Sequence, residues 1–141
     1  MAFSDIYRVS GSAMTAQTVR LNTIASNLAN AETPALDEET VYKARRPVFA
    51  AVYQNGQLMN DRALTGARVQ VLDVVSTGNA LQRYEPHHPM ANTDGYVWYP
   101  DVNVVEEMAD MMSASRNFET NVDVLNNVKS MQQSLLRLGE A

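Results

Sequence analysis

Apolar side chains near the start of the chain follow a helical pattern with a seven-residue period. The pattern has two adjacent rows, one with Tyr7, Met14, Leu21 and Leu28 and one with Phe3, Ile24 and Ala31. This spacing gives a helix one apolar seam, which Ser10 and Gln17 interrupt. Thr33 precedes Pro34, and the residue before a proline is pushed out of helical backbone. The pattern therefore predicts a helix over residues 3–31.

A longer amphipathic pattern fills the end of the chain. Asn103 and Glu106 have the spacing of a capping box, so a helix should begin there, and Gly139 suits its end. Apolar residues follow in steps of three and four and shift phase by one position near the end: Val104, Met108, Met111, Phe118, Val122 and Leu125, then Val128, Met131, Leu135 and Leu138. The predicted helix over residues 103–138 is about 50 Å long at a rise of about 1.5 Å per residue.

The sequence between these helices favours β-structure. Runs rich in β-branched and aromatic residues occupy residues 40–53, 67–75 and 96–99. Asn55-Gly56 and Asp94-Gly95 are hairpin-type turn signals. We expect two or three hairpins, with loops over residues 54–66 and 76–80 and an irregular, proline-bracketed segment over residues 85–92.

Composition narrows the function classes. Sixteen acidic against eleven basic residues give a net charge of -5, the wrong sign for binding a phosphate backbone, so nucleic acid is not an expected partner. The sequence lacks a run of about 20 apolar residues, and we expect no membrane insertion. Its first residues have neither a basic start nor a continuous apolar stretch, so we expect no cleaved secretory signal.

Candidate catalytic chemistry is sparse. The chain has no cysteine, and His87 and His88 are adjacent residues between prolines rather than one helical turn apart. Glu106, Glu107 and Asp110 fall in the first turns of the second helix, where acids complement the helix dipole. A basic group is interpreted as the solvent side of a strand: Lys43, Arg45 and Arg46. We therefore predict no enzyme, no metal site and no cofactor.

Asparagine is more frequent in both helices than helix propensity favours. Asn27 and Asn30 lie three residues apart, on one side of the first helix. One hypothesis is that they bond to a neighbouring subunit and set register. The alternative is a solvated helix end, where asparagine is favoured for local reasons.

These patterns predict an α+β protein in three segments: a helix in residues 1–34, a β-hairpin-rich insert in residues 35–100 and a helix in residues 101–141. The helices should form a coiled-coil-like layer, and their seams can pair with each other or with other subunits. The candidate subunit-interface residues are Tyr7, Met14, Leu21, Ile24, Asn27, Leu28, Asn30, Met108, Met111, Phe118, Val122, Leu125, Val128, Met131 and Leu135.

Several segments carry a family resemblance. Residues 10–13 (SGSA), 20–23 (RLNT) and 25–31 (ASNLANA) resemble the N-terminal signature of the bacterial flagellar axial proteins, which build the rod and hook. Later segments are similar to basal-body rod proteins: residues 42–49 (YKARRPVF), 84–86 (YEP), 89–91 (PMA), 94–97 (DGYV), 100–108 (PDVNVVEEM), 113–119 (SASRNFE), 124–126 (VLN) and 128–131 (VKSM).

The resemblance implies a structural subunit of the proximal rod, in the shaft that transmits motor torque to hook and filament. It implies export through the flagellar type III apparatus, assembly in the periplasm with other rod proteins and copies of itself, and terminal helices packed as an inner layer. A small helical flagellar export chaperone or adaptor is the alternative from a different class. Such a protein would bind a client helix in a groove, and the β-rich insert is hard to justify there.

Overall fold

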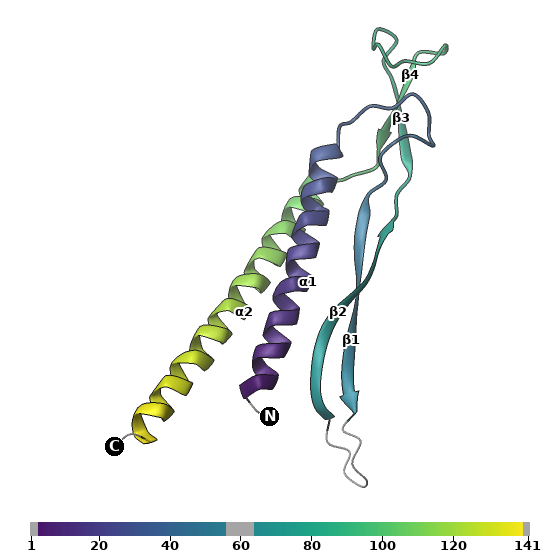
Figure 1. Cartoon of the computed structure of the whole chain (residues 1–141). Coiled ribbons are helices and arrows are strands. Elements are labelled where there is room, and N and C mark those ends of the chain that lie inside the picture. Colours follow the sequence, from purple (N-terminus) through teal and green to yellow (C-terminus); the bar gives the residue numbers. More distant parts are fainter. Residues whose placement is uncertain (1–2, 56–63, 140–141) are drawn as a thin grey trace.

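The computed structural model describes residues 3–55 and 64–139 and shows an elongated molecule (Figure 1). Two long helices lie side by side, and a β-ribbon runs along them. The elements in chain order are α1 (Phe3–Asn30), β1 (Arg45–Asn55), β2 (Leu64–Ser76), β3 (Ala80–Tyr84), β4 (Tyr96–Pro100) and α2 (Val104–Gly139). Both termini lie at one end of the molecule, and β3 and β4 lie at the other.

Both terminal helices are confirmed nearly to the residue. α1 ends at Asn30, four residues before the proline that the sequence marks as a stop. At the start of α2, Oδ1 of Asn103 accepts hydrogen bonds from the backbone N–H groups of Val105 (3.1 Å) and Glu106 (3.3 Å). The helices pack along each other, and Tyr7 donates a hydrogen bond to Gln132 near the terminal end (3.1 Å). Their coiled-coil-like geometry stays a prediction.

The insert contains two antiparallel strand pairs, β1 with β2 and β3 with β4. In the first pair Val48 lies opposite Asp73 and Phe49 opposite Val71, so Leu72 is an extra, bulged residue. In the second pair, Gly95 adopts a φ of +84° in the turn before β4, where a Cβ atom would lie 3.0 Å from the ring of Tyr84. The predicted Asp94-Gly95 turn is thereby confirmed.

The predicted strand boundaries need three corrections. β1 begins at Arg45 rather than at residue 40, because residues 37–40 form a turn in which Thr40 bonds to Asp37. The strands extend through residues 54–55 and 64–66, which the sequence assigns to a loop; residues 56–63, with half of the Asn55-Gly56 signal, lie outside the described residues. β3 has no counterpart among the predicted strands, because its short run of mixed residues carries a weak pattern.

Small side chains dominate the buried positions between the layers. Ala16, Ile24, Ala114 and Val128 are buried on the helices, and Val97 is fully buried in β4. Many large apolar side chains remain exposed, for example Leu138, which is 75% exposed. The described helices include none long and apolar enough to cross a membrane. The single chain therefore buries a thin core and leaves apolar surface open.

Gln17 gives a test of the helix pair. Its Oε1 atom is buried without a hydrogen-bond partner, on the row of α1 that also holds the buried Ser10 and Ile24. An unpaired buried acceptor is destabilising, so Gln17→Leu should raise the free energy of unfolding by about 1 kcal/mol in urea titrations. Gln133→Leu, at an exposed position of α2, is the matched control and should change it little. A less stable Gln17→Leu chain would contradict this packing.

Candidate functional site

The structure sorts the predicted interface residues by how far the chain itself covers them. Three are buried: Ile24, Asn27 and Val128. Eight are half-buried: Met14, Leu21, Leu28, Asn30, Met111, Phe118, Val122 and Leu125. Four are exposed: Tyr7, Met108, Met131 and Leu135. Most of the predicted seam thus lies at partly or fully covered positions of a chain whose two helices pack on each other.

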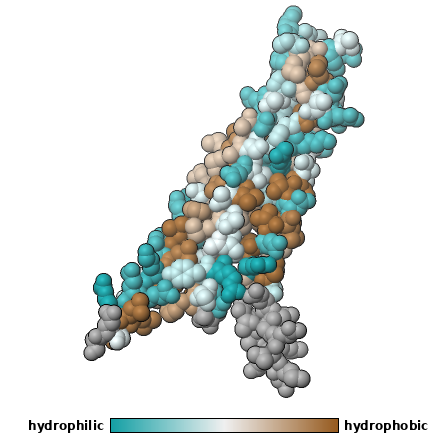
Figure 2. Space-filling view, viewed as in Figure 1, coloured by the Kyte–Doolittle hydropathy of each residue, from teal (hydrophilic) through white to brown (hydrophobic). Residues whose placement is uncertain are grey.

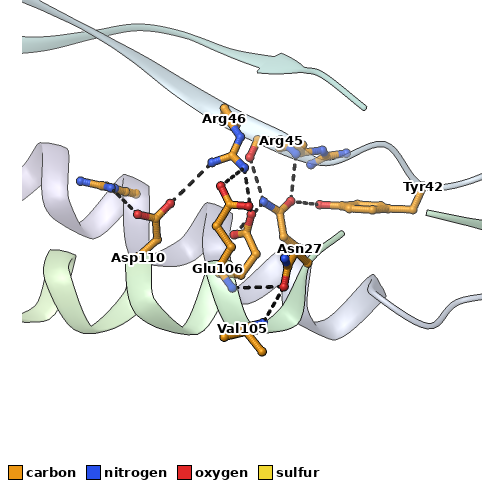
Figure 3. A network of polar contacts seen from close by, with 10 residues as sticks. Asn27, Tyr42, Arg45, Arg46, Val105, Glu106 and Asp110 are labelled. Carbon is orange, nitrogen blue, oxygen red and sulfur yellow. Dashed lines mark hydrogen bonds and ion pairs between the residues drawn. The ribbon is translucent and has the colours of Figure 1, made fainter. Parts of the chain in front are cut away.

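A polar cluster joins the two helices to the start of the β-ribbon (Figure 3). We call it the polar clasp, and it consists of Arg20, Asn27, Tyr42, Arg45, Arg46, Glu106, Glu107 and Asp110. Its residues come from α1, from the connection after α1, from β1 and from the first turns of α2. The clasp is therefore the place where every long element except β2 contributes a polar side chain.

Asn27 lies at the centre of the polar clasp and is only 1% exposed. Its Oδ1 accepts hydrogen bonds from the backbone N–H of Arg45 (2.9 Å) and the hydroxyl of Tyr42 (2.9 Å). Its Nδ2 donates to the backbone carbonyl of Arg45 (2.9 Å) and to Oε2 of Glu107 (3.1 Å). These bonds use both amide hydrogens and both oxygen lone pairs.

Arg46 forms the charged half of the polar clasp. Its guanidinium lies 3.6 Å from Glu106, 3.5 Å from Glu107 and 3.5 Å from Asp110. Asp110 also accepts a hydrogen bond from Arg20 of α1 (3.0 Å). Glu107 is only 2% exposed, so the cation of Arg46 and the amide of Asn27 compensate a carboxylate that is removed from water.

Within the chain, the hydrogen-bonding groups of Asn27 are already engaged by Tyr42, Arg45 and Glu107. The bond to a neighbouring subunit that the sequence suggests for Asn27 stays a prediction. The amide nitrogen of Asn30 donates to the carbonyl of Ser26 in the same helix (2.8 Å), and an intersubunit role of its oxygen stays a prediction.

The sequence interpretation missed the polar clasp by treating its charges separately. Glu107 and Asp110 do lie in the first turns of α2, where they complement the helix dipole, but they also pair with cations of other elements. Arg46 is not simply the solvent side of a strand. The sequence does contain a signal for this pairing. A basic cluster (Lys43, Arg45 and Arg46) lies near the start of the insert, and an acidic cluster of similar size (Glu106, Glu107 and Asp110) follows its end.

The described residues offer no metal-binding cluster of three or more histidine, cysteine or acidic side chains. His88 lies in the irregular connection between β3 and β4, where its Nδ1 accepts a hydrogen bond from the backbone N–H of Met90 (3.1 Å). The contacts of the polar clasp serve to join secondary-structure elements.

Comparison with known families places this architecture among flagellar rod subunits. The family described as "Flagella basal body rod protein" matches residues 8–34, within α1 and the turn after it. The family described as "Flagellar basal body rod FlgEFG protein C-terminal" matches residues 93–138, which include β4 and nearly all of α2. Both terminal helices therefore carry rod-protein sequence.

Curated relatives narrow the assignment. Flagellar basal-body rod protein FlgC of Escherichia coli O6:H1 is 45% identical over 141 residues, covering 99% of this chain and 100% of the relative. The FlgC proteins of Salmonella typhimurium (42% over 142 residues; 99% and 100% covered) and Borreliella burgdorferi (36% over 147 residues; 96% of each) are also similar. The chain belongs to the FlgC family of flagellar basal-body rod proteins. Its relatives are named as rod proteins and not as enzymes.

The polar clasp predicts a large effect of a single amide. Asn27→Ala removes the hydrogen-bond partner of the N–H and carbonyl of Arg45 and leaves the buried Glu107 with Arg46 alone, so the free energy of unfolding should fall by about 2–4 kcal/mol. Asn30→Ala is the matched control, because the side chain of Asn30 donates its hydrogen bond to Ser26 of the same helix, and alanine there should be neutral or slightly stabilising. Urea denaturation of both variants measures the difference; equal effects would show that Asn27 has no special role.

Proposed function

We propose that the chain is a structural subunit of the proximal rod that packs its two helices against neighbouring rod subunits and helps transmit torque from motor to hook. The observation that carries this proposal is the full-length similarity to FlgC proteins, joined to a chain whose long helices leave apolar side chains exposed. Apolar surface of this extent on a slender molecule is typical of a protein that is completed by partners.

The exposed apolar side chains of α2 support a role in assembly. Two groups of them lie near the two ends of the helix: Val105, Met108 and Met112, and Met131, Leu135, Leu136 and Leu138. Figure 2 shows apolar surface at the C-terminal end of α2, at the lower left, and further patches along the molecule. Burial of such side chains against other rod subunits, or copies of the chain, would stabilise the rod by about 25 cal/mol per Å² of apolar area.

We further propose that residues 1–34 and 101–141 form the inner, helical part of the rod and residues 35–100 the outer part. The supporting feature is the layering in Figure 1, in which the β-ribbon covers one side of α1 and leaves much of α2 open. The predicted interface residues on α2 then face neighbouring subunits where the chain does not cover them.

The route to the rod follows from the same family assignment. We propose export of the chain through the flagellar type III apparatus without a cleaved signal peptide, followed by assembly in the part of the rod that crosses the periplasm. An export chaperone or adaptor, the alternative from sequence, is not supported, because the relatives are rod proteins.

Leu135 gives the direct test of the assembly surface. It is 55% exposed in the chain, so Leu135→Asp should leave the fold intact but place a charge where a neighbouring subunit would bury apolar surface. In a flagellated bacterium that lacks its own FlgC, this variant should be secreted normally and yield few complete basal bodies and little motility. The half-buried Leu28 and Leu125 are poorer choices, because a charge there also disturbs the chain's own helix pair.

Leu135→Met is the matched control, since it keeps an apolar side chain of similar volume and should restore basal bodies to wild-type numbers. Normal motility of Leu135→Asp at normal protein levels would contradict the assignment of this surface.

A further inference from the structure

The amide of Asn27 takes the place of a neighbouring strand at the first residue of β1. Its Nδ2 and Oδ1 exchange two 2.9 Å hydrogen bonds with the carbonyl and N–H of Arg45. This is the pattern that two residues form in a hydrogen-bonded pair of an antiparallel ladder. The β-ribbon is thus joined to α1 through the backbone of β1. Which residue supplies these backbone groups depends on the register of β1 and not on the type of its side chain.

We propose that Asn27 is a positioning residue that fixes the register and angle of the β1–β2 ribbon on α1, and that Glu107 makes this position depend on the docking of α2. The second hydrogen of Nδ2 is donated to Glu107, so one amide contacts both the ribbon and α2. This coupling is a property of the free chain and does not depend on the rod assignment.

The register is specified twice. If β1 slipped by one residue, Ala44 or Arg46 would face the amide of Asn27, and the guanidinium of Arg46 would leave the carboxylates of Glu107 and Asp110. The β1–β2 pair by itself fixes neither contact, because each strand pairs only with the other. A second contact lies further along the ribbon, where the backbone N–H of Val69 in β2 donates to Oγ of Ser12 in α1 (3.0 Å). The clasp fixes the start of β1, and this bond holds the ribbon along α1.

The dependence on α2 follows from burial. When α2 is docked, Glu107 is buried and its oxygens are compensated by the amide of Asn27 and by Arg46. When α2 is undocked, the amide of Asn27 loses one of its two acceptors and keeps the bonds to Arg45 and Tyr42, which are weaker without the polarising contact to Glu107. Helix pairing and ribbon position thereby become one cooperative event.

Spin labels can measure this coupling, because the chain has no cysteine of its own. Labels at Ala51→Cys on β1 and Asn22→Cys on α1, both at exposed positions, report the distance between ribbon and α1. The full chain with these labels should give one narrow distance distribution. Adding Glu107→Ala should broaden it and add a second, longer distance, although neither label lies on α2.

Glu106→Ala is the matched control. Glu106 is adjacent to Glu107 and lies equally close to Arg46, but its side chain is exposed and makes no hydrogen bond to Asn27. Its removal should leave the distribution narrow. Broadening by Glu106→Ala equal to that by Glu107→Ala would overturn the proposal, because the cause would then be general loss of charge around Arg46. An unchanged distribution in Glu107→Ala would overturn it as well.

Glu107→Gln keeps the test decisive if Glu107→Ala loses its helical circular dichroism. Glutamine retains an oxygen that accepts from Asn27 but removes the charge, so the distribution should stay as narrow as in the wild type. A broad distribution in a folded Glu107→Gln chain would contradict the role of the amide contact.

Discussion

A buried carboxylate beside a buried amide is the constraint on which the arrangement of this molecule depends. Glu107 is removed from water by the packing of α2, and a charge in that position is costly unless it is paired. Asn27 and Arg46 supply the compensation, one from α1 and one from β1. Because neither partner belongs to α2, the two helices and the ribbon must be in contact for the carboxylate of Glu107 to be paired. The polar clasp therefore specifies one arrangement of these elements.

Apolar burial alone would specify this geometry poorly. The helices bury small residues such as Ala16 and Ala114, and the ribbon has apolar residues on both of its faces, which permits several ways of lying on α1. The polar clasp selects among them, which is the role that buried polar groups play at specific positions in coiled coils. Large side chains such as Met108 and Leu135 stay available for other subunits.

Local signals predicted the helices well and the clasp poorly. The period of Tyr7, Met14, Leu21 and Leu28, the proline stop and the cap at Asn103 are properties of neighbouring residues, and each predicted element is present. The contact of Asn27 with Glu107 joins residues 80 positions apart, so its geometry depends on the crossing of two helices and on the path of residues 31–44 between α1 and β1. No periodic pattern in the sequence predicts a contact over that separation. β3 was missed for a different reason, because its five residues show no clear alternation of apolar and polar positions.

The side-chain amide of Asn27 offers the most direct test of the polar clasp. In the full chain labelled with ¹⁵N at asparagine, the two Nδ2 protons of Asn27 should exchange slowly with water and show nuclear Overhauser contacts to Arg45 and to Glu107. The exposed amide of Asn117 supplies the reference for fast exchange. Exchange of the Asn27 amide as fast as that of Asn117, without contacts to Glu107, would contradict the central place given to this residue.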